Sequence, residues 1–206
     1  QRILNFINGS FVPPTNNQYI PNVNPATGIT YSETPDSDVQ DINLAVAAAQ
    51  EAFLSWKNIS KEQRFLYLEK LAQAIETHAE ALALVETNDN GKPLWLAKDV
   101  DIPLAAENIR FYATGLKHFS SESHSMEDAA INYTLRQPLG VVGLISPWNL
   151  PLYMVCWKIA PALAAGNTVV IKPSEVTPMT AYLLCQLIQS IGFPPGVINM
   201  VHGKGD

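Results

Sequence analysis

The sequence has few cysteines, few basic residues and no long apolar run, and each shortage excludes a class of protein. Only Cys156 and Cys185 occur among 206 residues, too few for the disulfide framework of a secreted protein. Basic residues number 13 against 19 acidic ones, and this net charge of −6 argues against a nucleic-acid partner. Lys158, Pro161 and Lys172 break the longest apolar segments below the roughly 18 residues that span a bilayer. We therefore expect a cytoplasmic protein without a nucleic-acid or membrane partner.

Histidines are also scarce. His78, His118, His124 and His202 show none of the spacings of metal ligands, so we predict no bound metal. Apolar residues, in contrast, are plentiful: 47% of the chain is hydrophobic and 16% is charged, as in a globular protein with a substantial core. A chain of this length forms one well-buried domain, or one domain with a small appendage.

The first 119 residues predict a short β-rich lead-in followed by a layer of helices. Strand-like pieces alternate with turns rich in Asn, Pro and Gly over residues 1–40. From Asp36 onward, apolar residues recur three or four apart, which is the spacing of amphipathic helices. Ser37 or Asp38 can cap the first helix, and Ser60 with Gln63 has the spacing of a capping box for the second.

The rest of the chain predicts a short polar segment and then a parallel α/β unit. Residues 120–137 are rich in serine at their start and lead into a strand at 131–135 with one wet face. Residues 138–206 then follow the order strand, helix, strand, helix, strand. We place these elements at residues 140–145, 150–165, 168–171, 178–191 and 197–201, with the first strand covered on both faces.

This order predicts an α/β fold with a doubly wound, Rossmann-like parallel sheet. Two βαβ units share their middle strand, and such sheets bind ligands at the carboxyl ends of their strands. The chain stops directly after the third strand, where another helix should follow. We therefore expect a truncated sheet that belongs to a longer protein.

Polar residues follow the first two strands of this unit, and each has two interpretations. Asn149 is either the N-cap of the next helix or an amide donor that points into a cleft, and Trp148 is by default a core or packing residue. Lys172 and Glu175 form either a solvated turn, with Ser174 or Thr177 capping the next helix, or a ribose-binding site. A carboxylate at the end of the second Rossmann strand is suited to accept hydrogen bonds from an adenosine ribose.

Several segments together resemble the aldehyde dehydrogenase superfamily. They are residues 140–151 (GVVGLISPWNLP), 157–170 (WKIAPALAAGNTVV), 172–175 (KPSE) and 192–199 (GFPPGVIN). The similarity extends back through residues 6–9 (FING) and 24–28 (NPATG), and so covers essentially the whole chain. The sequence of these segments is most similar to that of the aminomuconate and hydroxymuconate semialdehyde dehydrogenase branch. That branch has an arginine directly after the Asp-Ile-Pro segment, where this chain has Leu104.

The resemblance implies oxidation of an aldehyde to a carboxylate with NAD, through a thioester on a cysteine. Asn149 would supply the side-chain half of the oxyanion hole, while the nucleophilic cysteine and the general-base glutamate would lie beyond Asp206. The chain by itself is therefore predicted to be inactive. A carboxylate at Glu175 repels a 2′-phosphate, which favours NAD over NADP. The cofactor-binding residues would be Ile145, Ser146, Pro147, Trp148, Asn149, Lys172, Ser174, Glu175 and Gly205.

The same resemblance divides the chain into three parts. Residues 1–119 would form the N-terminal part of the cofactor-binding domain, 120–137 a segment of an antiparallel oligomerisation arm, and 138–206 the dinucleotide-binding core. The catalytic domain would be absent, and the complete protein would be a homodimer or homotetramer. Two other functions stay open: a non-catalytic dinucleotide-binding or assembly module, and a coenzyme A-acylating aldehyde dehydrogenase. For residues 120–137, the simpler alternative is a surface hairpin.

Overall fold

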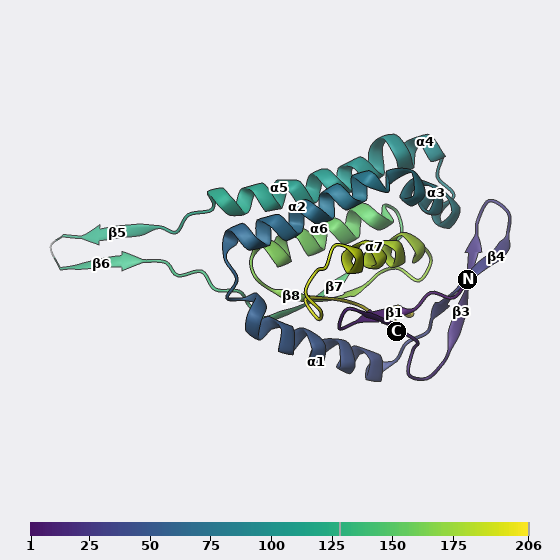
Figure 1. Ribbon diagram of the computed structural model, residues 1–206, viewed down its shortest axis with the longest axis horizontal. Helices are drawn as coiled ribbons and strands as arrows, with labels where there is room; N and C mark the ends of the chain where they lie inside the picture. The colour runs from purple at the N-terminus through teal and green to yellow at the C-terminus, as the bar shows by residue number, and fades with distance from the viewer. Residues whose placement is uncertain (128, 206) are drawn as a thin grey trace.

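The computed structural model describes residues 1–127 and 129–205 and has a five-stranded sheet at its centre (Figure 1). Strands β7 (Val141–Ile145), β8 (Thr168–Lys172) and β9 (Ile198–Met200) are parallel neighbours, which confirms the predicted Rossmann-like core. Strand β1 (Asn5–Ile7) pairs antiparallel with β9, and β2 (Ser10–Val12) pairs antiparallel with β1. The lead-in therefore extends the main sheet, which the sequence pattern did not indicate.

Helices cover both faces of this sheet. Helix α6 (Pro151–Ala164) connects β7 to β8, and α7 (Met179–Ser190) connects β8 to β9 on the same face. Helix α1 (Val39–Trp56) covers the opposite face (Figure 1). Successive residues of β8 point to opposite sides, so Val169 packs with α6 and α7 while Val170 packs with α1. The chain thus builds one half of a doubly wound sheet.

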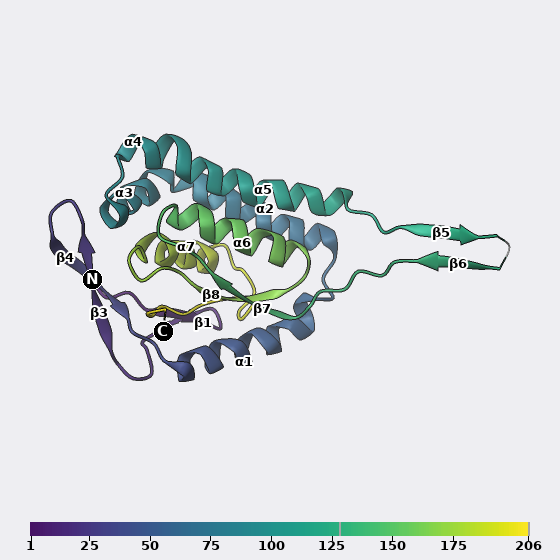
Figure 2. The same cartoon turned by 180° about the vertical axis from the view of Figure 1, so that it is seen from behind.

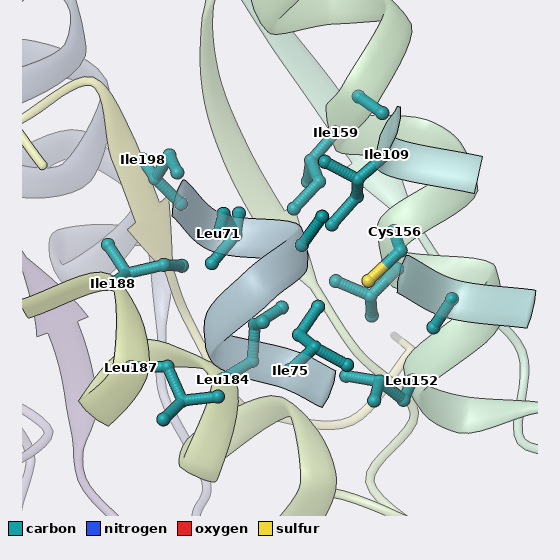
Figure 3. Close-up of a cluster of buried hydrophobic side chains, with 14 of the residues drawn as sticks. Leu71, Ile75, Ile109, Leu152, Cys156, Ile159, Leu184, Leu187, Ile188 and Ile198 are labelled. Atoms are coloured by element: carbon teal, nitrogen blue, oxygen red, sulfur yellow. The ribbon is translucent and has the colours of Figure 1, made fainter. Parts of the chain in front are cut away.

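A second helical layer lies over α6 and α7, as Figures 1 and 2 show. It consists of α2 (Lys61–Thr77), α3 (Ala79–Asn90) and α5 (Ile102–His118), with the short α4 (Leu94–Leu96) and a π-helical turn, η1 (Ala97–Asp101), between α3 and α5. The main core fills the space between the two layers and the sheet (Figure 3). Its labelled side chains are Leu71, Ile75, Ile109, Leu152, Cys156, Ile159, Leu184, Leu187, Ile188 and Ile198.

Local capping signals fix the starts of the first two long helices. Asp38 is the N-cap of α1, and its side chain accepts a hydrogen bond from the Gln40 backbone N–H at 2.8 Å. Asp41 completes a capping box by accepting from the Asp38 backbone N–H. Ser60 and Gln63 form the predicted capping box of α2. Both predictions are confirmed, with Asp38 rather than Ser37 as the cap.

The predicted caps of α7 are wrong. Neither Ser174 nor Thr177 caps this helix, which begins after Pro178 without a side-chain cap of its own. The Met179 backbone N–H instead donates to Asp89 Oδ2 at 2.6 Å. A carboxylate at the end of α3 thus accepts from a backbone N–H that has no partner within α7. This contact joins two helices that are far apart in the sequence.

Two hairpins stand outside the main sheet. Strands β3 (Tyr19–Asn24) and β4 (Ile29–Pro35) form one, and β5 (Ser123–Met126) and β6 (Ala130–Tyr133) form a long arm that projects away from the body (Figures 1 and 2). The expectation of one wet and one covered face in the arm is wrong. Every described side chain of β5 and β6 is exposed, because neither face of the hairpin packs on the body.

The expectation that the strand now labelled β7 is covered on both faces is wrong, and this strand lies at an edge of the five-stranded sheet. Its residues are only half-buried or exposed, and Ile145 is 72% exposed. Within residues 1–127 and 129–205, no helix is long and apolar enough to cross a membrane. The described residues also contain no group of three or more His, Cys, Asp and Glu side chains that could hold a metal ion.

Candidate functional site

Except for Gly205, which follows β9, the predicted site residues lie at or directly after the carboxyl ends of β7 and β8, which are neighbouring strands. Ile145 and Lys172 are paired in the parallel register of the two strands. The Ser146 backbone N–H donates to the Lys172 carbonyl at 3.1 Å, so the two connecting loops start in contact. Side chains from both loops are thus brought to one edge of the sheet, as expected of a parallel α/β unit.

A hollow of about 310 Å³ lies at this edge, between the ends of β8 and β9 and the start of α1. Lys172 and Gly205, both predicted to bind the cofactor, line it. The predicted residues from Ile145 to Asn149 and from Ser174 to Glu175 lie outside the hollow. Its other lining residues are Ser37, Asp38, Val39, Ile42, Val201, His202, Gly203 and Lys204.

Lys172 and Glu175 form an ion pair, with Nζ and Oε2 3.1 Å apart, and both side chains are partly exposed. Lys172 Nζ also donates to the Pro173 carbonyl at 3.0 Å. Burial alone would raise the pKa of Glu175, but a backbone hydrogen bond and the Lys172 ammonium outweigh it and lower the pKa. Ser174 is buried, and its Oγ accepts from the Val176 backbone N–H at 3.2 Å. The loop therefore presents an ionised carboxylate beside a cation.

The loop after β7 places Asn149 differently from a helix cap. The N-cap position of α6 is Leu150, without a side-chain hydrogen bond, so the N-cap interpretation of Asn149 is wrong. Pro151 occupies the first turn of the helix and favours this start, because its ring fixes a helical φ. Asn149 is exposed, and its side chain is not used in capping. Trp148 is 59% exposed and is not the core residue expected by default.

Ser146 is the buried member of the same loop. Its side chain is 3% exposed, and its Oγ has no hydrogen-bond partner among the described residues. A buried hydroxyl without a partner is uncommon in folded proteins, and either an ordered water or a ligand can supply the missing hydrogen bond. Its contact with a cofactor stays a prediction, as does that of Pro147, which is exposed at the surface of the loop.

Sequence reasoning missed two residues that hold this loop. Asn90 Nδ2 donates to the Trp148 carbonyl at 2.8 Å, and Lys92 Nζ donates to the Asn149 carbonyl at 3.3 Å. Gly91 lies between them in a left-handed conformation, φ 80°, which ends α3 and turns Lys92 inward. The Asn-Gly pair indicated only the end of a helix, and nothing local to it indicated the contact with the loop.

His202 is a further residue that the sequence did not indicate. It lines the hollow at the end of β9, is 1% exposed, and neither ring nitrogen has a partner among the described residues. Burial, and then the nearby Lys172 ammonium, lower its pKa to about 3. The imidazole is therefore neutral at physiological pH.

The surroundings of the two cysteines do not suit a nucleophile. Cys156 lies within α6 and Cys185 within α7, and both are fully buried. Burial raises the pKa of both thiols, and Glu86 raises that of Cys156 further. A reactive cysteine needs the thiolate form, which these surroundings disfavour.

We compared the sequence and the fold with those of known proteins. The model of the aldehyde dehydrogenase family matches residues 11–206. The chain is 48% identical over 202 residues to a 2-aminomuconic semialdehyde dehydrogenase of Danio rerio, covering 98% of this chain and 41% of that protein. It is 44% identical over 201 residues to an acetaldehyde dehydrogenase of Pseudomonas aeruginosa, covering 98% of this chain and 40% of that protein.

A solved structure shows the same fold. The NAD⁺ complex of an aldehyde dehydrogenase from Bacillus cereus superposes with a TM-score of 0.97 at 40% identity, covering 100% of this chain and 42% of that one. The chain thus spans about two fifths of the length of the proteins it matches. Since the family model covers nearly the whole sequence and the folds superpose throughout, the chain belongs to the aldehyde dehydrogenase family.

Proposed function

We propose that this chain is the N-terminal, cofactor-binding portion of an NAD-dependent aldehyde dehydrogenase that oxidises an aldehyde to a carboxylate in the cytoplasm. The observation that carries the proposal is the contact between the loops after β7 and β8, which places the Asn149 loop beside the Lys172–Glu175 pair. Residues 1–119 belong to the cofactor-binding domain, 120–137 to an oligomerisation arm, and 138–206 to the dinucleotide-binding core. The nucleophilic cysteine and the general base belong to the remainder of the protein.

The cofactor proposal is supported by the residues at the ends of β7 and β8. When bound, NAD accepts the hydride that the aldehyde carbon loses. The Glu175 carboxylate, kept ionised by its surroundings, can accept hydrogen bonds from both hydroxyls of a ribose and would repel a 2′-phosphate. Lys172 offsets part of that repulsion, so the preference for NAD over NADP is one of degree. Ile145, Pro147, Trp148, Ser174 and Gly205 would contact the cofactor around these polar groups.

Asn149 is the chain's proposed catalytic residue. Because its amide is exposed and not used as a helix cap, its N–H₂ can donate to the oxyanion that forms when a thiolate adds to the aldehyde. The relatives include proteins named for a semialdehyde and for acetaldehyde. The resemblance to the muconate semialdehyde branch implies an arginine that meets the substrate carboxylate directly after the Asp-Ile-Pro segment, and this chain has Leu104 there, exposed on α5. We therefore infer that an uncharged aldehyde is preferred.

The test is the reaction of the full-length protein with a panel of charged and uncharged aldehydes, with NAD and NADP in parallel. We expect NADH formation, and Asn149→Ala should lower kcat by about 100- to 1000-fold. Asn43→Ala removes an exposed amide from α1 and serves as the matched control, with kcat unchanged. A full-length protein that binds NAD but reduces it with no aldehyde would favour a non-catalytic module. Release of an acyl-coenzyme A instead of the free acid would favour the acylating alternative.

A further inference from the structure

A buried ionic cluster lies behind the Asn149 loop. Lys92 Nζ lies 2.8 Å from Glu86 Oε1 and 2.5 Å from Asp101 Oδ2. The side chains of Lys92, Glu86 and Asp101 are 6%, 0% and 4% exposed. They come from three places, namely α3, the turn after α3, and the end of η1. The cluster therefore connects α3 to η1 within the second helical layer, at the point where that layer meets the start of α6.

The cluster is bonded to both ends of the segment that carries Asn149. An ammonium has three N–H donors, and the third of Lys92 donates to the Asn149 carbonyl at 3.3 Å. The second oxygen of Glu86 accepts from the Leu152 backbone N–H, in the first turn of α6, also at 3.3 Å. Asn90 Nδ2 adds two contacts outside the cluster, to the Trp148 carbonyl at 2.8 Å and to the Asn149 carbonyl at 3.5 Å. Residues 148–152 are thus held through their main chain at three points.

Such a cluster is poorly explained by stability alone. Taking charges out of water is costly, and burial raises the pKa of Glu86 despite the adjacent ammonium. Buried ion groups often contribute little net stability compared with apolar residues of the same volume. They do fix geometry, because each charge must keep its partners. The geometry fixed here is that of the main chain next to Asn149.

We propose that Lys92, held between Glu86 and Asp101, is a positioning residue for Asn149. The Asn149 side chain has no capping bond to orient it, so its direction follows from the main chain of residues 148–152. Lys92 holds that main chain by the Asn149 carbonyl, and Glu86 holds it by the Leu152 amide. The catalytic consequence rests on the proposed function, whereas the mechanical role does not.

Hydrogen exchange in the full-length protein tests the mechanical role. In Lys92→Met, the amides of Asn149, Leu150 and Leu152 should exchange at least about 10-fold faster than in the wild type, because the segment loses its contact with Lys92 and Glu86 loses its cation. Asp89→Asn is the matched control, since it perturbs another buried carboxylate that caps α7 at Met179. It should speed exchange at Met179 and leave residues 149–152 unchanged. Equal exchange of residues 149–152 in Lys92→Met and the wild type overturns the proposal.

Kinetics tests the consequence for Asn149. Lys92→Met should lower kcat by up to about 100-fold, as small displacements of catalytic groups do, with the KM for NAD within about twofold. In an Asn149→Ala background, the same change should lower kcat no further, because the residue that it positions is gone. Multiplicative losses in the double variant would show a role independent of Asn149 and overturn the proposal.

A variant without a buried charge guards against a failure to fold. Asn90→Ala removes the contact with the Trp148 carbonyl and the longer one with the Asn149 carbonyl, and it should show the same pattern with a smaller loss of kcat, about three- to tenfold. If this folded variant keeps the kcat of the wild type and the amide exchange of residues 148–150 is unchanged, the turn after α3 does not position the Asn149 loop. If the wild type oxidises no aldehyde, the proposed function fails, and the exchange experiment alone decides the role of Lys92.

Discussion

His202 is the most unusual titratable residue of the described chain. It is buried beside the hollow at the end of β9, and both ring nitrogens lack a hydrogen-bond partner among the described residues. An unpaired polar group in a folded interior costs free energy unless water or a ligand satisfies it. The imidazole stays neutral because burial and the Lys172 ammonium lower its pKa to about 3. The folded protein therefore resists protonation at a site where the unfolded chain does not.

This difference predicts a pH dependence of stability. In the unfolded chain, a histidine has a pKa of about 6.5. Between pH 6.5 and 3 the unfolded state binds a proton at His202 and the folded state does not, so acidification favours unfolding. Stability should fall by roughly 1 kcal/mol per pH unit in this window, and His202 should add no slope above it.

Urea denaturation at pH 7, 6, 5 and 4 measures the effect. His202→Gln keeps a polar side chain without an ionisable group, so its stability should fall less steeply with acidification than that of the wild type. The difference between the two slopes isolates His202 from the carboxylates, which titrate in both proteins. Equal slopes would show that the histidine is protonated in the folded state as easily as in the unfolded one.

At the scale of single elements, the N-cap of α1 makes a testable contribution to stability. Asp38 accepts from the Gln40 backbone N–H and lies at the positive end of an 18-residue helix. Asp38→Ala should lower the free energy of unfolding by about 1 kcal/mol, because an N–H at the helix start loses its acceptor. Asp38→Ser retains an acceptor and should lose much less. Chemical denaturation of both variants provides the measurement, and equal stabilities would contradict the capping role.

The elements that the sequence predicted correctly are those that local pattern determines. The capping residues of α1 and α2 are two or three positions from their partners, and the βαβαβ order follows from the alternation of short apolar runs with helical spacing. Contacts between distant segments were not predictable in this way. Phe6 pairs with Met200 across the sheet, and Asp89 caps α7 from 90 residues away. The sequence around these residues contains no local pattern that indicates which distant segment they contact.

In the candidate site, too, only the residues with a local sequence signal could be predicted. Asn149, Lys172 and Glu175 could be selected because they follow buried strands, where parallel sheets place their ligands. Lys92 could not, because it reaches Asn149 across 57 residues and its own surroundings indicate only the end of a helix. The default interpretation of Trp148 as a core residue also failed, since exposure depends on which elements cover the loop. Sequence pattern thus located the loops but not what holds them in place.

At the scale of the whole molecule, the arm formed by β5 and β6 stands out because its described residues do not pack against the rest of the chain. It projects from the body in both views, and its described side chains are exposed on both faces (Figures 1 and 2). An isolated two-stranded hairpin is only marginally stable in water, and unpaired strand edges tend to bind further strands. Ile131 and Tyr133, which are 74% and 63% exposed, lie on one face of β6. These properties fit the homodimer or homotetramer that the family resemblance implies for the complete protein, and we propose that a second copy covers the arm there.

Substitution on the two faces of β6 separates this proposal from a free surface hairpin. Ile131→Lys places a charge on the apolar face and, if that face is buried between copies, should weaken association by about 3 kcal/mol, or roughly 100-fold in the dissociation constant. Asn132→Lys adds the same charge on the opposite face of the same strand and is the matched control. Sedimentation velocity of the full-length protein should show smaller species for Ile131→Lys alone. If neither substitution changes the sedimentation coefficient, the hairpin is a surface feature, because a buried strand face cannot accept an unpaired lysine without loss of affinity.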